Sequence, residues 1–407
     1  MTHIKKHAEL MNTAVINTDF IPYGRQSISK EDIAAVVKTL QSDFLTQGPC
    51  VAEFEQAVAN KVGAQYAVAV NSATSALHLA CLALGVTADD RVWTSPNTFI
   101  ASANCARYCG ASVDFVDIDP HTYNLCANKL ADKLALAKLS NTLPNVVIPV
   151  HFAGQSCDML AIHQLSQEYG FRIIEDASHG IGALYQGDYV GNSHLSDICV
   201  FSFHPVKIIT SAEGGMALTN HEQLAKHMRT HAHQGITKSP DELTQTPGDW
   251  YYEQHTLGFN YRMTELQAAL GLSQLAKLDD FIAQRHQQFA LYAELLRDLP
   301  ITLPYQSNDS RSSLHLYPIL LPQSHISARK AVFDALRSAN IGTQVHYIPV
   351  HTQPYFQALG FTWGDFPVAE DYYHRTLSLP LFVGLTPAQQ YHVVAVLTHA
   401  LAEQGIK

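Results

Sequence analysis

The stretch CVFSFHPVKIITSAEGG, residues 199–215, runs from an apolar segment into a turn that carries Lys207. Apolar residues at both odd and even positions suit a strand that is covered on both faces of a sheet. Burial of a lysine past such a strand lowers its pKa, which makes the amine nucleophilic enough to form an imine near neutral pH. A lone lysine is usually a surface residue, but Ser202, Glu213 and the paired glycines set this segment apart.

Apolar runs of the same kind alternate with helical patterns along the first half of the chain. They cover residues 66–70, 91–94, 113–117, 146–150, 172–174, 198–203 and 215–219. This alternation predicts an α/β fold with a mostly parallel sheet of about seven strands flanked by helices. Ligands of such sheets bind at the carboxyl ends of the strands, so polar residues at those ends are candidates for a site.

The chain divides by pattern into three parts. We expect an N-terminal extension over residues 1–20, a large domain over 21–270 and a smaller α+β domain over 271–407. Helices are expected after a Ser29 cap with Asp32 three positions on, and over residues 51–62, 263–299, 327–339 and 387–403, with a loop at 241–250.

Composition excludes several kinds of partner. The 407 residues carry a formal net charge of -10, and no run of Lys or Arg would follow a nucleic acid or an anionic membrane. No stretch reaches the roughly 18 apolar residues of a membrane span, and the start lacks the apolar core of a secretory signal. The protein is therefore expected in the cytoplasm, with any anionic ligand held by a few aimed donors in a pocket.

Metal and dinucleotide motifs are weak in this sequence. The seven cysteines form no CxxC pair, and the 22 histidines come without HExxH or a matched Cys/His quartet. We therefore expect reduced cysteines and no metal site. No Walker A motif is present, and Gly180-x-Gly182 lacks the third glycine of a dinucleotide-binding turn.

In RIIEDASHG, residues 172–180, a strand delivers two carboxylates and a histidine to its carboxyl end. A carboxylate beside a pyridine nitrogen keeps that nitrogen protonated, so that the ring can absorb electrons when a substrate loses a proton. Asp176 fits that role. Capping of a following helix by Glu175 and Asp176 explains the same residues equally well.

The segment from Tyr66 to Ala80 runs from a strand through small hydroxyl residues into a helix. Free amides at the helix start, the hydroxyls of residues 72–75 and the helix dipole together form a site for a phosphate, although ordinary capping is the alternative. Phe99 follows another strand end, where it could stack on a flat ring or simply pack in the core.

Taken together, these stretches resemble the DegT/DnrJ/EryC1/StrS sugar aminotransferases, a family of fold-type I pyridoxal-phosphate enzymes, along almost the whole chain. The segments that carry the resemblance are LTQG from Leu45, NSATSALHLA from Asn71, NTFIASAN from Asn97, EDASHGIGA from Glu175, SFHPVK ending at Lys207, EGG from Glu213 and GFNYRMTELQAALGLSQL from Gly258. The similarity is strongest to the branch that aminates a UDP-linked 4-keto-6-deoxy sugar on the route to pseudaminic acid.

The resemblance implies a role for each matching residue. Lys207 would hold pyridoxal 5'-phosphate as a Schiff base and then move protons as a general acid and base. Asp176 would pair with the pyridine nitrogen, His179 would approach the ring hydroxyl, and Phe99 would stack on the ring. The phosphate would be bound by Ser72, Ala73, Thr74 and Ser202, and by Asn260 of a neighbouring subunit.

A homodimer follows from the role of Asn260, and the resemblance also implies the substrates. They would be L-glutamate and a UDP-linked keto-sugar, and the sugar nucleotide would contact Tyr23, Leu45, Thr46, Gln47, Gly48, His346, Tyr347, Ile348 and Pro349. Two residues depart from the usual family pattern. Ala73 stands where relatives usually have Gly, and His179 replaces a common Gln.

Three other classes fit less well. A dehydratase of the same family has histidine in place of the lysine, so Lys207 argues against it. A regulator that uses the fold to sense the cofactor would need a basic DNA-binding module, and the N-terminal extension is too short for one. A nucleotide-sugar dehydrogenase or epimerase needs the glycine fingerprint after the first strand.

Overall fold

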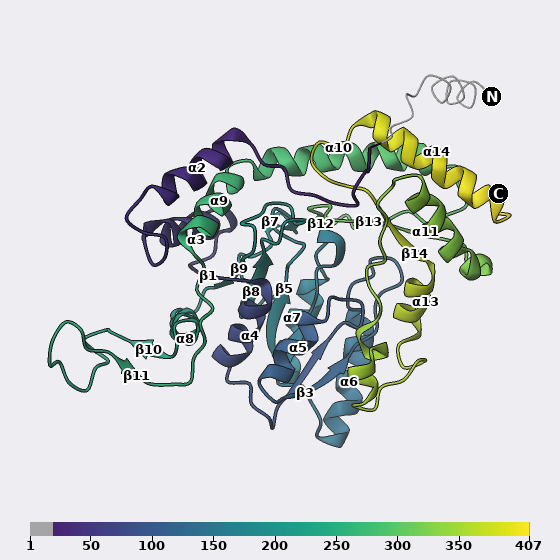
Figure 1. Cartoon of the computed structure of the whole chain (residues 1–407). Coiled ribbons are helices and arrows are strands. Elements are labelled where there is room, and N and C mark those ends of the chain that lie inside the picture. The colour runs from purple at the N-terminus through teal and green to yellow at the C-terminus, as the bar shows by residue number, and fades with distance from the viewer. Residues whose placement is uncertain (1–18, 407) are drawn as a thin grey trace.

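A seven-stranded sheet forms the centre of the computed structural model, which describes residues 19–406 (Figure 1). In spatial order its strands are β1 (Tyr66–Val70), β9 (Gly215–Thr219), β8 (Ile198–Ser202), β5 (Arg172–Asp176), β4 (Val146–Ile148), β2 (Arg91–Thr94) and β3 (Ser112–Phe115). β9 is antiparallel to both of its neighbours, and the other pairs are parallel. The predicted seven-stranded, mostly parallel sheet is confirmed.

Strand boundaries differ from the prediction by a few residues. The predicted runs 113–117 and 146–150 extend two residues beyond β3 and β4, whereas the run 172–174 stops two residues before the end of β5. The last two residues of β5 are Glu175 and Asp176, which a purely apolar criterion leaves out. The strand therefore carries its carboxylates inside the sheet, not beyond it.

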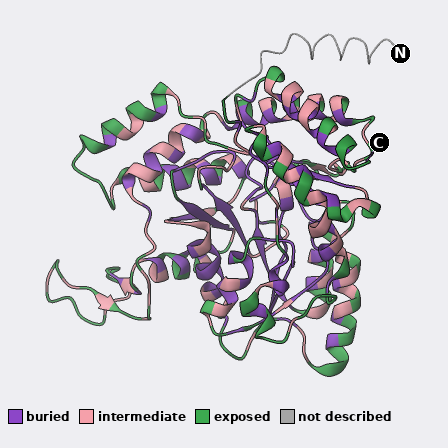
Figure 2. Ribbon diagram, turned by 45° about the vertical axis from the view of Figure 1, so that its right-hand side comes forward, coloured by how far each residue is buried: buried purple, intermediate pink, exposed green. Residues whose placement is uncertain are grey.

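Alternate residues of the strands face two different hydrophobic cores. Val68, Ile174 and Val200 belong to a cluster on one face, whereas Ala69 and Phe201 belong to a cluster on the other. Helices cover both faces, and the buried residues concentrate along the sheet and on the helix surfaces turned toward it (Figures 1 and 2). This arrangement explains why the strands are apolar at both parities.

The helices on the sheet and at its N-terminal side follow the predicted pattern. Their bounds are α2 (Lys30–Leu40), α3 (Pro49–Val62), α4 (Ala73–Ala83), α5 (Ala101–Tyr108), α6 (Ala127–Ser140), α7 (Met159–Tyr169) and α8 (Glu222–Ala232). The Ser29 cap of α2 is confirmed, because the Ser29 hydroxyl accepts the Asp32 N–H and the Asp32 carboxylate accepts the Ser29 N–H. α3 begins two residues before the predicted 51–62, because a proline suits the first helical position.

The predicted helical region 263–299 forms two helices, α9 (Glu265–Leu275) and α10 (Leu278–Leu296). The helix predicted over 327–339 is α11 (Arg329–Ser338), preceded by a 3-10 turn, and α14 (Pro387–Glu403) matches its prediction. The predicted loop 241–250 is the tip of a hairpin formed by β10 (Ile236–Thr237) and β11 (Glu253–Gln254), which projects from the body (Figure 1).

A second core lies in the C-terminal part of the chain. It packs α10, α11 and α14 around the pair β13 (Tyr317–Leu320) and β14 (Thr376–Leu379). Ile21 joins this core and pairs with Ile341. The division at residue 270 stays a prediction. Of the predicted extension, all but Asp19 and Phe20 lies outside the described residues.

Across residues 19–406, every helix is too short or too polar for the hydrocarbon core of a bilayer.

Candidate active site

A cavity of about 410 Å³ opens at the carboxyl ends of β5 and β8, beside the start of α4. The predicted site residues that line it are Tyr23, Ser72, Ala73, Thr74, Phe99, Asp176, His179, Ser202, Lys207, His346 and Tyr347. They come from segments up to 324 positions apart in the sequence, from Tyr23 to Tyr347. The fold therefore gathers most of the predicted site around one cavity.

Lys207 lies in the turn that follows β8, where its backbone N–H donates to the His204 carbonyl at 2.9 Å. Burial lowers the pKa of Lys207 to about 8, although the negative charge of Asp176 opposes the shift. With such a pKa about a tenth of the amine is unprotonated at pH 7, far more than for an ordinary lysine. The side chain is thus able to act as a nucleophile.

Asp176 is the last residue of β5 and is 5% exposed. One carboxylate oxygen accepts a hydrogen bond from the Ser102 hydroxyl at 2.6 Å, and the other accepts the Ser178 N–H at 3.1 Å. Thr98 lies 2.7 Å from Ser102 and extends this chain of hydroxyls. Residues 178–182 form turns, so the capping interpretation of this carboxylate applies to a turn and not to a helix.

His179 is buried between Tyr347 and His315. Its Nε2 is 3.1 Å from the Tyr347 hydroxyl, and its ring centroid is 4.3 Å from that of His315. Burial, followed by the charge of Lys207, holds the pKa of His179 well below its usual value. The imidazole is therefore neutral at physiological pH.

The start of α4 forms a cradle for an anion. Ser72 caps the helix by accepting the Ser75 N–H at 3.1 Å, so the N–H groups of Ala73 and Thr74 precede the capped turn and face the cavity with Ser202. Gly215 allows β9 to pass this helix start, since a Cβ there would lie 2.4 Å from the Ala73 nitrogen. Only glycine fits at that point of the sheet.

Several predicted residues lie outside this cavity in the described chain. Gln47 and Gly48 line a separate cavity of about 440 Å³, which Arg229 and Arg262 also line. Just before them in the chain, Thr46 pairs with Thr264, and the Leu45 carbonyl accepts the Glu265 N–H.

The remaining predicted residues lie on other loops. The Asn260 carbonyl accepts a hydrogen bond from the side-chain amide of Asn71. Ile348 is exposed, and the Pro349 carbonyl accepts the Thr352 N–H.

The structure adds residues that the sequence did not single out. Ser102 supports Asp176, and His315 packs against His179 from the C-terminal part of the chain. Thr98 precedes α5, so helical spacing does not mark Ser102 in the sequence. Nothing in the local sequence marks His315.

The cavity fits pyridoxal phosphate at both ends. A nucleophilic lysine and a buried carboxylate face the space where the ring and its aldehyde would lie, and the helix start supplies donors for the phosphate. Within residues 19–406 no three His, Cys, Asp or Glu side chains converge as metal ligands. The fold and this donor set define a fold-type I pyridoxal-phosphate enzyme.

Comparison with known proteins gives the family. Residues 26–398 match the model of the DegT/DnrJ/EryC1/StrS aminotransferase family, so the chain belongs to that family. It is a pyridoxal-phosphate-dependent nucleotide-sugar aminotransferase, as the resemblance of the sequence indicated. The protein Spr1654 from Streptococcus pneumoniae, solved in its PLP form, is 26% identical, with a TM-score of 0.85 over 95% of this chain and 99% of that one.

Three other relatives are more similar in sequence. The spore coat polysaccharide biosynthesis protein SpsC of Bacillus subtilis is 40% identical over 90% of this chain and 93% of its own. The UDP-4-amino-4,6-dideoxy-N-acetyl-beta-L-altrosamine transaminase of Campylobacter jejuni is 37% identical over 88% and 92%. The solved PseC aminotransferase of Helicobacter pylori is involved in pseudoaminic acid biosynthesis. It is 31% identical, with a TM-score of 0.87, and the match covers 95% of this chain and 100% of that one.

Proposed function

We propose that the enzyme transfers an amino group from L-glutamate to C4 of a UDP-linked 4-keto-6-deoxy-N-acetylhexosamine, in the cytoplasm, on the route to pseudaminic acid. Two relatives support this substrate: the altrosamine transaminase of Campylobacter jejuni, at 37% identity, and the PseC aminotransferase of Helicobacter pylori, at 31% identity. The 40% identical relative is named for spore coat polysaccharide, so another nucleotide-linked keto-sugar is the main alternative.

The observation that carries the proposed chemistry is the pairing of Lys207 with Asp176 across one cavity. Lys207 would hold the cofactor through its Nζ, and the same amine would act as the general acid and base that moves a proton at the substrate carbon. Asp176 keeps the pyridine nitrogen protonated. Pyridoxal phosphate, when bound, supplies the electron sink.

The remaining residues of the cavity would bind the cofactor and orient its ring. Ser72, Ala73, Thr74 and Ser202 would hold the phosphate at the start of α4, Phe99 would stack on the ring, and neutral His179 would face the ring hydroxyl. Phe99 is 58% exposed at the cavity wall, which leaves its face available for stacking. Asn260 reaches the same phosphate from the second subunit of a homodimer.

The substrate side is proposed from two groups of residues. Tyr23, His346 and Tyr347 line the cavity of their own chain, with Ile348 and Pro349 next along the segment. Leu45 to Gly48 lie outside this cavity, so in the dimer they would reach the sugar nucleotide of the partner subunit. Burial and the charge of Lys207 lower the pKa of His346 to about 3, so this histidine offers a neutral ring to the sugar.

The test is to incubate the protein with pyridoxal phosphate, L-glutamate and a panel of UDP-linked 4-keto-6-deoxy sugars. The expected result is one aminated product at C4, identified by mass and NMR, together with 2-oxoglutarate in equal amount. Lys207→Ala protein is the matched control. Amination of only a different nucleotide-linked keto-sugar would replace the proposed substrate, and loss of water without nitrogen transfer would favour a dehydratase.

A further inference from the structure

His346 is held in the wall of the cavity by contacts on several sides. It is 7% exposed, and its backbone carbonyl accepts the Tyr372 hydroxyl at 2.9 Å. Its ring packs against two tyrosines that also line the cavity, with centroid distances of 5.3 Å to Tyr23 and 5.0 Å to Tyr347. These contacts fix the orientation of the imidazole.

One nitrogen of this ring is bound inside the protein and the other is not. His346 Nδ1 lies 2.9 Å from the hydroxyl of Ser378, a residue of β14. Nε2 has no hydrogen-bond partner among residues 19–406, and His346 lines the cavity. Nε2 is therefore the nitrogen that a ligand in the cavity can reach.

The buried hydroxyl of Ser378 decides which nitrogen carries the hydrogen of the neutral ring. Ser378 is 0% exposed, and its backbone N–H and carbonyl are already paired with Gln344. Within the described part of the chain, His346 Nδ1 is the one acceptor for the hydroxyl hydrogen, and a buried hydroxyl without an acceptor is unfavourable. Ser378 thus donates to Nδ1, and the single ring hydrogen lies on Nε2.

We propose that Ser378 is a positioning residue that makes His346 a hydrogen-bond donor to the sugar substrate through Nε2–H. The group that it binds is an uncharged oxygen of the sugar, either the keto oxygen or a hydroxyl, because proteins usually bind carboxylates with charged donors such as arginine. This inference rests on the proposed keto-sugar substrate. Ser378 is 32 positions from His346 and does not line the cavity, so it acts only through the histidine.

The first experiment records the ¹⁵N chemical shifts of the histidine ring nitrogens in the apoprotein at pH 7. Among the 22 histidines, His346 is assigned by the signals that His346→Gln removes. Wild-type protein should show a hydrogen on Nε2 and a bare Nδ1. In Ser378→Ala the two shifts should move toward each other as the two tautomers mix.

The matched control for the shifts is Thr376→Val, which removes the other buried hydroxyl of β14 and should leave the His346 shifts unchanged. A hydrogen on Nδ1 in wild-type protein would overturn the proposal, and so would shifts that Ser378→Ala does not move. Because no substrate is present, this result stands whichever nucleotide-linked keto-sugar the enzyme accepts. A wrong substrate and a wrong tautomer are therefore told apart.

The second experiment measures the two half-reactions in separate single turnovers, with the keto-sugar that the product assay identifies. Ser378→Ala should slow amination of the keto-sugar about tenfold, the size expected for one hydrogen bond, and should leave the reaction with L-glutamate within about twofold. Equal losses in both half-reactions would overturn the proposal.

His346→Gln gives a background in which Ser378 has no tautomer to set, because an amide N–H takes the place of Nε2–H. Adding Ser378→Ala to this variant should change the keto-sugar rate by less than about twofold. The same tenfold loss in this background would show that Ser378 acts through packing, which would overturn its role as a positioning residue.

Discussion

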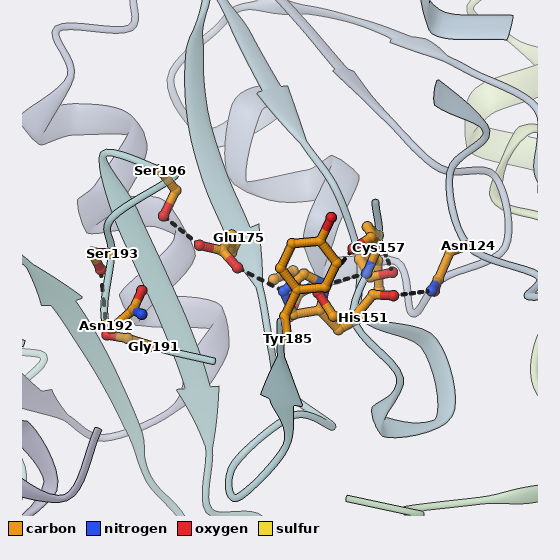
Figure 3. Close-up of polar contacts among 12 residues, drawn as sticks. Asn124, His151, Cys157, Glu175, Tyr185, Gly191, Asn192, Ser193 and Ser196 are labelled. Atoms are coloured by element: carbon orange, nitrogen blue, oxygen red, sulfur yellow. Dashed lines mark hydrogen bonds and ion pairs between the residues drawn. The ribbon is translucent and has the colours of Figure 1, made fainter. Parts of the chain in front are cut away.

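The two faces of β5 put neighbouring carboxylates to different uses. Glu175 and Asp176 are consecutive, and each is 5% exposed. On one face Glu175 is 2.7 Å from His151 and also accepts a hydrogen bond from Ser196 (Figure 3). On the other face Asp176 accepts hydrogen bonds from the Ser102 hydroxyl and the Ser178 N–H, and it lines the cavity. Equal burial therefore says little about role, and the surroundings of each carboxylate decide it.

The Glu175 side is a closed network. His151 accepts the Cys157 N–H at Nδ1, at 3.1 Å, so its Nε2 carries the proton that faces Glu175. Every polar group in this set has a partner within the protein, which is what a structural role requires. The Asp176 side leaves a nucleophilic amine and free helix N–H groups facing open space, which is what binding and chemistry require.

Among the changes on the Asp176 face of β5, Lys207→Ala should have the largest effect on turnover. Loss of the amine should abolish covalent cofactor attachment and lower turnover by about a thousand-fold or more, with little change in the melting temperature of the apoprotein. Borohydride reduction followed by peptide mapping tests the attachment, with wild-type protein as the control. Normal turnover by the variant would remove Lys207 from the chemistry.

Asp176→Asn and Glu175→Gln form a matched pair of neutralising changes. Asp176→Asn should lower turnover by about a hundred-fold or more and leave stability almost unchanged, because the ring nitrogen loses its charged partner. Glu175→Gln should leave turnover within a few-fold but lower the free energy of unfolding by about 1–3 kcal/mol, because a buried network loses an acceptor. Steady-state rates and urea unfolding measure both, and the reverse pattern would exchange the two roles.

The pH dependence of cofactor loading should also distinguish Asp176 from Glu175, because only Asp176 acts on the pKa of Lys207. The unprotonated amine reacts, so the loading rate of the apoprotein should rise about tenfold per pH unit and level off above pH 8. The charge of Asp176 raises the pKa of Lys207, so Asp176→Asn should move the midpoint below pH 8, whereas Glu175→Gln should not move it. Stopped-flow absorbance across pH 6 to 10 gives the midpoints. A midpoint near 10 in wild-type protein would contradict the desolvated lysine.

The smallest effects should come from the supporting hydroxyls. Ser102→Ala removes the 2.6 Å bond to Asp176 and should lower turnover by about three- to tenfold. Ser196→Ala removes the bond to Glu175 and should instead lower the free energy of unfolding by about 1–2 kcal/mol. The two variants are compared in the same rate and unfolding assays, and equal loss of activity in both would erase the distinction between the faces.

The sheet could be predicted closely because its strands are short, apolar and covered on both sides. The carboxylates at the end of β5 were harder to assign, since alternation tells that Glu175 and Asp176 face opposite ways but not which face holds the cavity. That answer depends on where α4 and the turn at Lys207 pack, which is a property of the tertiary fold.

The site residues from the C-terminal part of the chain were also hard to predict, because their contacts depend on the tertiary fold. The segment His346–Pro349 was singled out by resemblance, but its contact with His179 spans 168 positions in the sequence. His315 packs against His179 without any local motif. Of the segment Leu45–Gly48, Gln47 and Gly48 line a different cavity of the same chain, and the role of the segment stays a prediction that depends on a second subunit.

The position of β9 has a consequence for how the molecule is made. β1 borders only β9 in the sheet, and β9 is the last of the seven strands to leave the ribosome. A nascent chain that ends before Gly215 therefore has no strand with which β1 can pair, and nothing yet presses on the start of α4. Cofactor capture during translation would have to wait until some 220 residues have emerged from the exit tunnel.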